Sequence, residues 1–182
     1  MLGVRVEIFA FLNVLFFVAV FVSALVASFV FVPPPLVEGE VPSYLLSEGW
    51  VLTVLFIFVW NLVLSAFLVV TLPGLVFFAL SAFLLAYRGA VWGFFLAFAS
   101  TPLFLAALPT VVLEGEGYVL ASVAGTVLGL SWFKPGWVFR GENVSRRKAL
   151  RKAFRECFYL YVLACVFLFV AAVVETVTLY LV

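Results

Sequence analysis

The 182-residue chain is 68% hydrophobic and only 10% charged, and its mean hydropathy is +1.34. Soluble domains of this length carry about 25% charged residues, so this composition predicts a polytopic membrane protein whose helices face lipid. The sequence has no His, Asp or Gln, which removes the most common general base and metal ligand together with all Asp-based chemistry. We therefore expect a non-enzymatic protein with no metal ion and no cofactor.

The charges are distributed unevenly along the chain. The net charge is +1, yet eight of the ten Lys and Arg residues lie between Lys134 and Arg155. By the positive-inside rule, the basic loop of residues 134–157 is predicted to be cytoplasmic. The protein is then a multi-pass protein of the cell membrane, and its last span ends with the C-terminus outside.

Residues 8–32 are the first predicted span. They form an apolar run of 25 residues, longer than a signal-peptide core, so we expect an uncleaved transmembrane helix. An acidic loop, residues 33–49, leads to the second span, residues 50–72. Asn61 lies near the middle of this second span. Because an uncompensated amide is costly in lipid, we expect Asn61 to face another helix and to make an interhelical hydrogen bond rather than bind a ligand.

Residues 73–108 allow two interpretations. A Pro-Gly pair opens the region, and two short apolar segments, 75–87 and 91–108, flank Arg88 and Gly89. They are either two short crossings or one broken, re-entrant unit whose free backbone groups are buried in protein. The fold is accordingly predicted as an all-α membrane bundle of five or six apolar helical segments in a single domain. The side of the membrane on which the N-terminus lies depends on this count, with a preference for the cytoplasmic side.

A helix over residues 110–133 is predicted to carry a stripe of small residues. They recur every four positions, at Gly117, Ala121, Gly125 and Gly129. Residues i and i+4 lie on one face of a helix, and such a stripe lets a second backbone come close in lipid. The Gly89-xxx-Gly93 pattern predicts a second close-packing site. We expect these stripes to pack helices within the chain or between protomers.

Three carboxylates lie inside predicted spans. Glu114 and Glu116 are expected roughly 6–9 Å from the outer end of their helix, and Glu175 roughly 10 Å from the outer end of the last one. An intramembrane ionisable residue is a functional candidate, and Arg88 is the base expected to reach these acids. Glu114 and Glu116 are about 200° apart around the helix, so they cannot face one partner. Alternatively, both are hydrated residues of the membrane interface at a loose, glycine-containing helix start.

Residues 145–158 are predicted to form a basic amphipathic helix that precedes the last span, residues 158–182. Its apolar side is expected to hold Leu150, Ala153, Phe154 and Phe158. Its bases are Arg146, Arg147, Lys148, Arg151, Lys152 and Arg155. Such a cluster near a membrane attracts anionic lipid headgroups, at about 1 kcal/mol for each base. Nucleic acid is not expected as a partner, because aromatic residues are not interleaved with the charges.

Several of these residues match the sequence motifs of a known family in residue type and spacing. Pro109 and Glu114 fit an L-P-H-G-x-x-E element that is followed by a small residue at Ala121 and a glycine at Gly125. Upstream, Asn61 looks like the first residue of an Asn pair. Gly89 and Gly93 likewise look like an N-G-x-x-x-G element. In these features the chain resembles the SpoIIM family (stage II sporulation protein M, also called DUF95), which consists of small polytopic membrane proteins.

The chain departs from the family pattern at three places. Thr110 and Val111 replace the His-Gly of the first element, Leu62 replaces the second Asn, and Arg88 replaces the Asn before Gly89. Any function that relies on that His is absent here. The resemblance implies a non-enzymatic membrane component, a scaffold or assembly factor with a protein partner or a second copy of itself. The alternative is a small transporter or permease subunit with an intramembrane carboxylate site.

Overall fold

The computed structural model describes residues 2–31, 49–139 and 144–181. Its helices are α1 (Leu2–Val30), α3 (Trp50–Val59), η1 (Trp60–Thr71), α4 (Leu72–Val76), α5 (Phe78–Leu96), α6 (Thr101–Phe133), α7 (Pro135–Val138) and α8 (Arg146–Leu181). Within the described residues, five helical rods are long and apolar enough to cross a membrane. The predicted all-α membrane bundle is therefore confirmed, with five helices among the described residues that could each cross a membrane. Most of the predicted acidic loop lies outside them.

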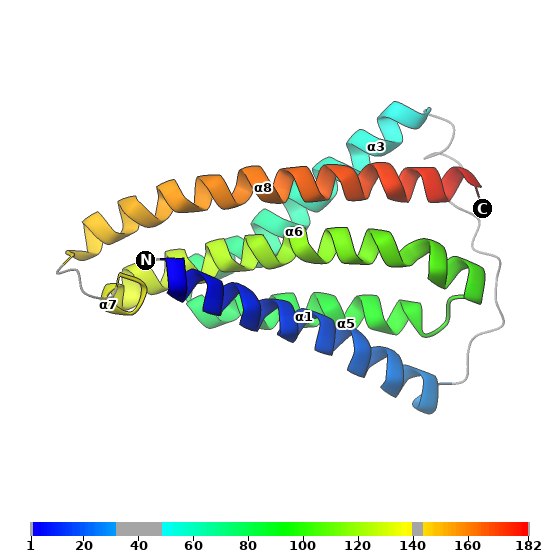
Figure 1. Ribbon diagram of the computed structural model, residues 1–182, viewed down its shortest axis with the longest axis horizontal. Coiled ribbons are helices and arrows are strands. Elements are labelled where there is room, and N and C mark those ends of the chain that lie inside the picture. The colour runs from blue at the N-terminus through cyan, green and yellow to red at the C-terminus, as the bar shows by residue number, and fades with distance from the viewer. Residues whose placement is uncertain (1, 32–48, 140–143, 182) are drawn as a thin grey trace.

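The bundle is built around α6. This helix contacts α8 most extensively and also packs against α1, α5 and η1, and it lies between α8 and the pair of α1 and α5 in Figure 1. Its residues from Gly117 to Ser131 are all buried. A helix that is covered on every side carries no polar face, which explains why this stretch has no amphipathic pattern.

The second rod runs from Trp50 to Val76 through α3, η1 and α4. Its centre, η1, is π-helical, a wider coil with i→i+5 hydrogen bonds that is uncommon and often marks functional positions. The Pro73-Gly74 pair does not end this rod, because α4 continues the coil of η1 through both residues to Val76, although Pro73 removes one backbone hydrogen bond at the junction. The chain turns instead at Phe77, which is extended.

The predicted interruption at Arg88 and Gly89 is wrong, because α5 runs through both residues as one helix. Gly89 and Gly93 instead allow α5 to pack closely against α1. A Cβ on Gly89 would lie 2.7 Å from the carbonyl oxygen of Phe16, and one on Gly93 would meet the Val20 carbonyl. These glycines therefore let two helix backbones touch, and α5 is a single crossing.

The start of the stripe helix was also predicted wrongly. α6 begins at Thr101 rather than residue 110, with Pro102 in its first turn and Pro109 inside the helix. A proline in the first turn is favourable, and the second proline removes a backbone hydrogen bond without ending the helix. Glu114 consequently lies thirteen residues into α6, roughly 20 Å from its start rather than the expected 6–9 Å.

The basic helix and the last span form one continuous helix, α8. Its basic part turns a small-residue face to the bundle, with Ala149, Ala153 and Cys157 buried. Of the four residues of the predicted apolar side, Ala153 is buried and Leu150 is half-buried, whereas Phe154 and Phe158 are exposed. Small side chains let α8 approach the bundle closely, whereas the large aromatic rings are left to face lipid.

An ion pair joins the first and last helices at one end of the bundle. Arg5 Nε donates a hydrogen bond to Glu156 Oε2 at 2.7 Å. Phe139, which is buried, lies between two cations, 5.3 Å from the Arg5 guanidinium and 4.8 Å from Lys152 Nζ. The start of α1, α7 and the basic part of α8 therefore share one end, as Figure 1 also shows.

Candidate functional site

Glu114 lies at the centre of a buried network of polar side chains. Asn61 Nδ2, from η1, donates a hydrogen bond to Glu114 Oε1. The Tyr118 hydroxyl donates to Glu114 Oε2 at 3.2 Å, and Arg88 Nη2, from α5, donates to the Tyr118 oxygen at 2.8 Å. With the neighbouring Ser65 and Glu175, these residues make up the polar cluster: Asn61, Ser65, Arg88, Glu114, Tyr118 and Glu175.

The secondary structure explains how the cluster is assembled. Glu114 and Tyr118 are four residues apart in α6, so both side chains lie on the same face and meet. That face is turned toward η1 and α5, which supply Asn61 and Arg88. The Arg88 guanidinium also lies 4.5 Å from the centre of the Tyr118 ring, where a cation is attracted by the ring electrons.

The side chains that α6 and η1 contribute to the cluster are shielded from solvent. The exposed fraction is 1% for Glu114, 6% for Asn61 and 0% for Tyr118. A buried carboxylate is tolerated only when hydrogen bonds and an opposite charge replace its water, and here both oxygens are bonded. The guanidinium reaches it through the Tyr118 hydroxyl, so the opposite charges are linked by a neutral donor.

α8 adds a second carboxyl group to this cluster. Glu175 is partly buried and lies close enough to Arg88 and Glu114 to interact with both. Two carboxyl groups thus share one guanidinium. The cluster joins four elements of the bundle: η1, α5, α6 and α8.

Glu116 is separate from this cluster. It accepts a hydrogen bond at 3.1 Å from Asn13 Nδ2 of α1 and is partly exposed. Glu114 and Glu116 therefore face different helices, in agreement with their angular separation. The three carboxylates do not converge, because Glu116 points toward α1 while Glu114 and Glu175 meet on another side of α6.

The small-residue stripe contacts several helices rather than one. A Cβ on Gly117 would lie 2.6 Å from Leu168 of α8, whereas one on Gly125 would lie 2.9 Å from the Thr71 carbonyl oxygen of η1. Gly129 meets the Gly74 carbonyl of α4. Each four-residue step advances about 40° beyond a full turn, so the two ends of the stripe are about 120° apart.

A second polar layer lies next to the stripe and was not predicted. Thr71 Oγ1 donates to the Ala121 carbonyl at 2.8 Å and is hydrogen-bonded to Tyr161. Ser81 Oγ lies 2.9 Å from the carbonyl oxygen of Val70, to which it donates. Single hydroxyl groups in apolar spans give no indication of their partners. Tyr118 could have been found, because it follows Glu114 by four residues.

The chemistry of the cluster suits holding helices together, because its hydrogen bonds join side chains from different helices. Within residues 2–31, 49–139 and 144–181, no group of three His, Cys, Asp or Glu side chains could hold a metal ion.

The six predicted lipid-contact bases of α8 lie at the end of the bundle opposite to the start of α6. Of these, Lys152 is partly buried against Phe139, and the other five are exposed.

Two of the residues that carry the family resemblance meet in space, and a third lies where two helices cross. Asn61 donates to Glu114, and Gly125 lies at the crossing of α6 with η1. The family model for stage II sporulation protein M matches residues 9–178. No curated protein and no solved structure matches the sequence significantly. Because the family model covers nearly the whole chain, the protein belongs to the SpoIIM family of membrane proteins.

Proposed function

We propose that this protein is a non-enzymatic membrane scaffold or assembly factor whose polar cluster fixes the arrangement of its helices. The supporting observation is that Glu114 is 1% exposed and uses both carboxylate oxygens for side-chain hydrogen bonds. A carboxylate that carries an ion along a transport path needs an oxygen that water or the ion can reach. A packed, fully bonded carboxylate suits a structural role.

A transporter or permease subunit is the second candidate. It is favoured by the position of two carboxyl groups and Arg88 deep within the bundle, next to an irregular helix. Transporters build their ion sites from charged groups at this depth beside interrupted helices. The two functions differ in whether water reaches the cluster.

Thiol accessibility distinguishes these candidates. We would introduce Ser65→Cys, a nearly isosteric change at a residue that is 3% exposed, into a Cys157→Ala, Cys165→Ala background. The scaffold predicts that a membrane-impermeant maleimide does not label this thiol in nanodiscs, although it does after unfolding in detergent. Ser145→Cys, at an exposed position before α8, is the positive control. Rapid labelling at position 65 in the folded protein would favour the permease and overturn the scaffold.

We further propose that the basic end of the bundle is cytoplasmic and contacts anionic lipid. Exposed bases on the first turns of α8 and the Arg5–Glu156 pair place the basic groups of α1 and α8 together. The positive-inside rule then assigns this end to the cytoplasm. In intact cells the Ser145→Cys thiol should resist an impermeant reagent and react in inverted vesicles. Labelling in intact cells would reverse the orientation.

A further inference from the structure

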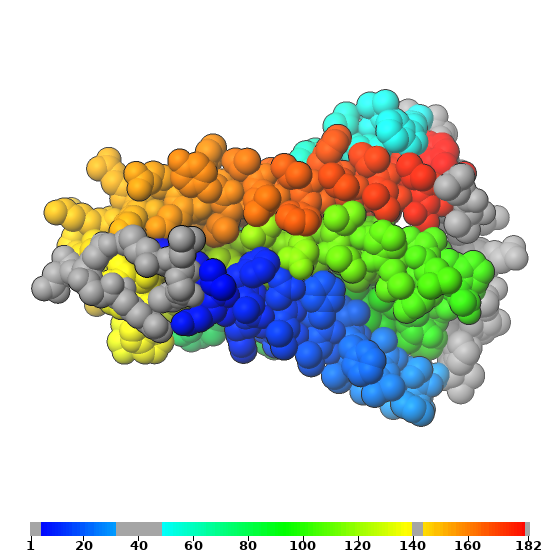
Figure 2. Space-filling view, in the orientation of Figure 1, coloured from blue at the N-terminus to red at the C-terminus, as the bar shows by residue number. Residues whose placement is uncertain are grey.

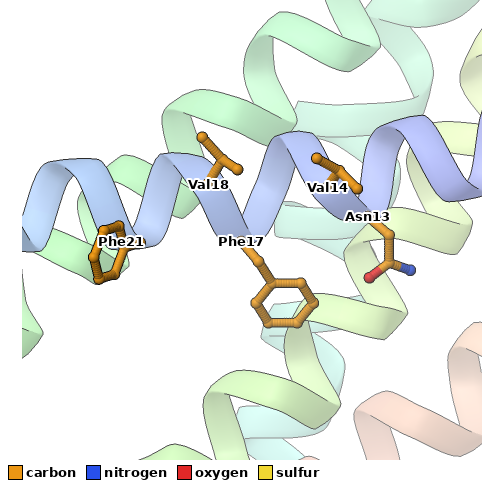
Figure 3. Close-up of a pocket in the computed structure, with 5 residues that line it drawn as sticks. All are labelled: Asn13, Val14, Phe17, Val18 and Phe21. Carbon is orange, nitrogen blue, oxygen red and sulfur yellow. The ribbon is translucent and has the colours of Figure 1, made fainter.

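A shallow apolar groove runs along α1 on the surface of the bundle. Its first part, of about 420 Å³, is lined by Asn13, Val14, Phe17, Val18 and Phe21. Figure 3 shows Asn13 and Phe17 projecting from the same side of α1, toward the α6 ribbon. A second hollow, of about 430 Å³, shares Phe17 and Phe21 and continues to Ser28 and to Phe104 of α6. The two parts together follow α1 for roughly 22 Å, most of an apolar bilayer core.

A carboxylate that lines neither hollow lies next to this groove, bonded to one of the lining residues. Asn13 lines it and donates to Glu116, which is the sixteenth residue of the 33-residue α6 and so lies near mid-depth. Glu116 is partly exposed, and within the described residues no Lys or Arg forms an ion pair with it. Glu114, by contrast, is buried with both oxygens bonded and a guanidinium nearby.

We propose that the α1 groove docks a transmembrane helix of a partner protein, and that a Lys or Arg in the middle of that helix pairs with Glu116. This inference rests on the scaffold function proposed above and names the surface through which the scaffold works. The groove supplies apolar contact along about four turns of helix. Asn13 holds the carboxylate beside the groove, and the partner's cation supplies the opposite charge that the described residues do not place there.

Charge complementarity selects this occupant over the others. An acyl chain would fill the apolar groove and leave the carboxylate unpaired, and an anionic headgroup would be repelled by it. A second copy of this chain would need an available base at mid-depth. Arg88 lies at that level, but it is bonded to Tyr118 within the polar cluster. A partner helix with its own base satisfies both the shape and the charge of the site.

The test uses the full-length chain in zwitterionic nanodiscs and a designed single-span Leu-Ala peptide with one central Lys. Binding is measured by energy transfer from a donor attached to the Ser145→Cys variant. A second peptide with Leu in place of Lys measures binding without the charge. The Lys peptide should bind about tenfold more tightly than the Leu peptide, and Glu116→Gln should abolish this difference.

A matched pair of variants tests the groove itself without altering the carboxylate. Val18 lines the groove and Val22 does not, although both belong to α1 and are 51% and 48% exposed. Val18→Trp should weaken binding of the Lys peptide about tenfold, whereas Val22→Trp should leave it unchanged. The inference is overturned if wild type binds both peptides equally, if the Lys preference survives in Glu116→Gln, or if the two Trp variants behave alike.

These outcomes are separable from the test of the scaffold function. If the protein shows no preference for the Lys peptide while the Ser65→Cys thiol stays unlabelled, the docking inference is refuted and the scaffold function stands. Labelling of that thiol overturns the scaffold, whatever the peptides do.

Discussion

Replacing Gly125 by Ala probes the contact between α6 and the second rod. A Cβ on Gly125 would lie 2.6 Å from Ser81 Oγ and 2.9 Å from the carbonyl oxygen of Thr71, and a Cβ on Gly74 would in turn lie 2.8 Å from the carbonyl carbon of Gly125. Contacts below 3.0 Å with backbone force a shift, and overpacking of this kind costs about 1–3 kcal/mol. Displacing Ser81 also weakens its bond to Val70, worth about 1 kcal/mol. The expected loss in the free energy of unfolding is about 2–4 kcal/mol.

The assay is reversible unfolding in mixed micelles, followed by the fluorescence of the five Trp residues. Gly136→Ala is the matched control, because a Cβ at Gly136 would meet nothing within 4 Å. Helix propensity favours Ala over Gly by up to about 1 kcal/mol, so the control should be neutral or slightly stabilising. Gly125→Leu should prevent folding. Equal changes in stability for the two Ala variants would refute the packing argument.

Three further variants test other contacts in the same unfolding assay. Asn61→Leu should cost about 1–3 kcal/mol by leaving Glu114 Oε1 without its side-chain donor, and the loss should shrink when Glu114→Leu is added. Additive losses would contradict this coupling. Arg5→Glu should destabilise by about 1 kcal/mol or more, and Glu156→Arg in the same chain should restore stability; no rescue would count against the ion pair. Gly93→Leu should separate α1 from α5, seen as protease cleavage within α1, and resistance equal to wild type would refute that contact.

The sequence indicated the membrane class, the central helix and the acidic and amide residues at its core. Hydropathy fixes which segments enter lipid, and small residues at four-residue spacing indicate close packing. It did not reveal that Arg88 and Gly89 lie inside one helix. A charged residue beside a glycine resembles a loop in sequence, and only the contacts with Tyr118 and Phe16 show why both belong in a span.

The partners of single polar residues were less predictable. Asn61 was expected to bond another helix, but no pattern indicated Glu114 as its acceptor, because that pairing depends on how η1 crosses α6. The distance of Glu114 from the start of its helix was underestimated, because the helix was expected to begin at residue 110, directly after Pro109, whereas α6 begins at Thr101 and contains Pro109. The π-helical geometry of η1 has no recognised sequence signature here.

The Asn61–Glu114 contact can be measured directly in bilayers by solid-state NMR, as dipolar transfer from Asn side-chain nitrogen to Glu carboxyl carbon. Two contacts of about 3–4 Å are predicted, Asn61 to Glu114 and Asn13 to Glu116. Asn61→Leu should remove the first and leave the second. A folded protein that shows only the Asn13 contact would contradict the account of a buried cluster centred on Glu114.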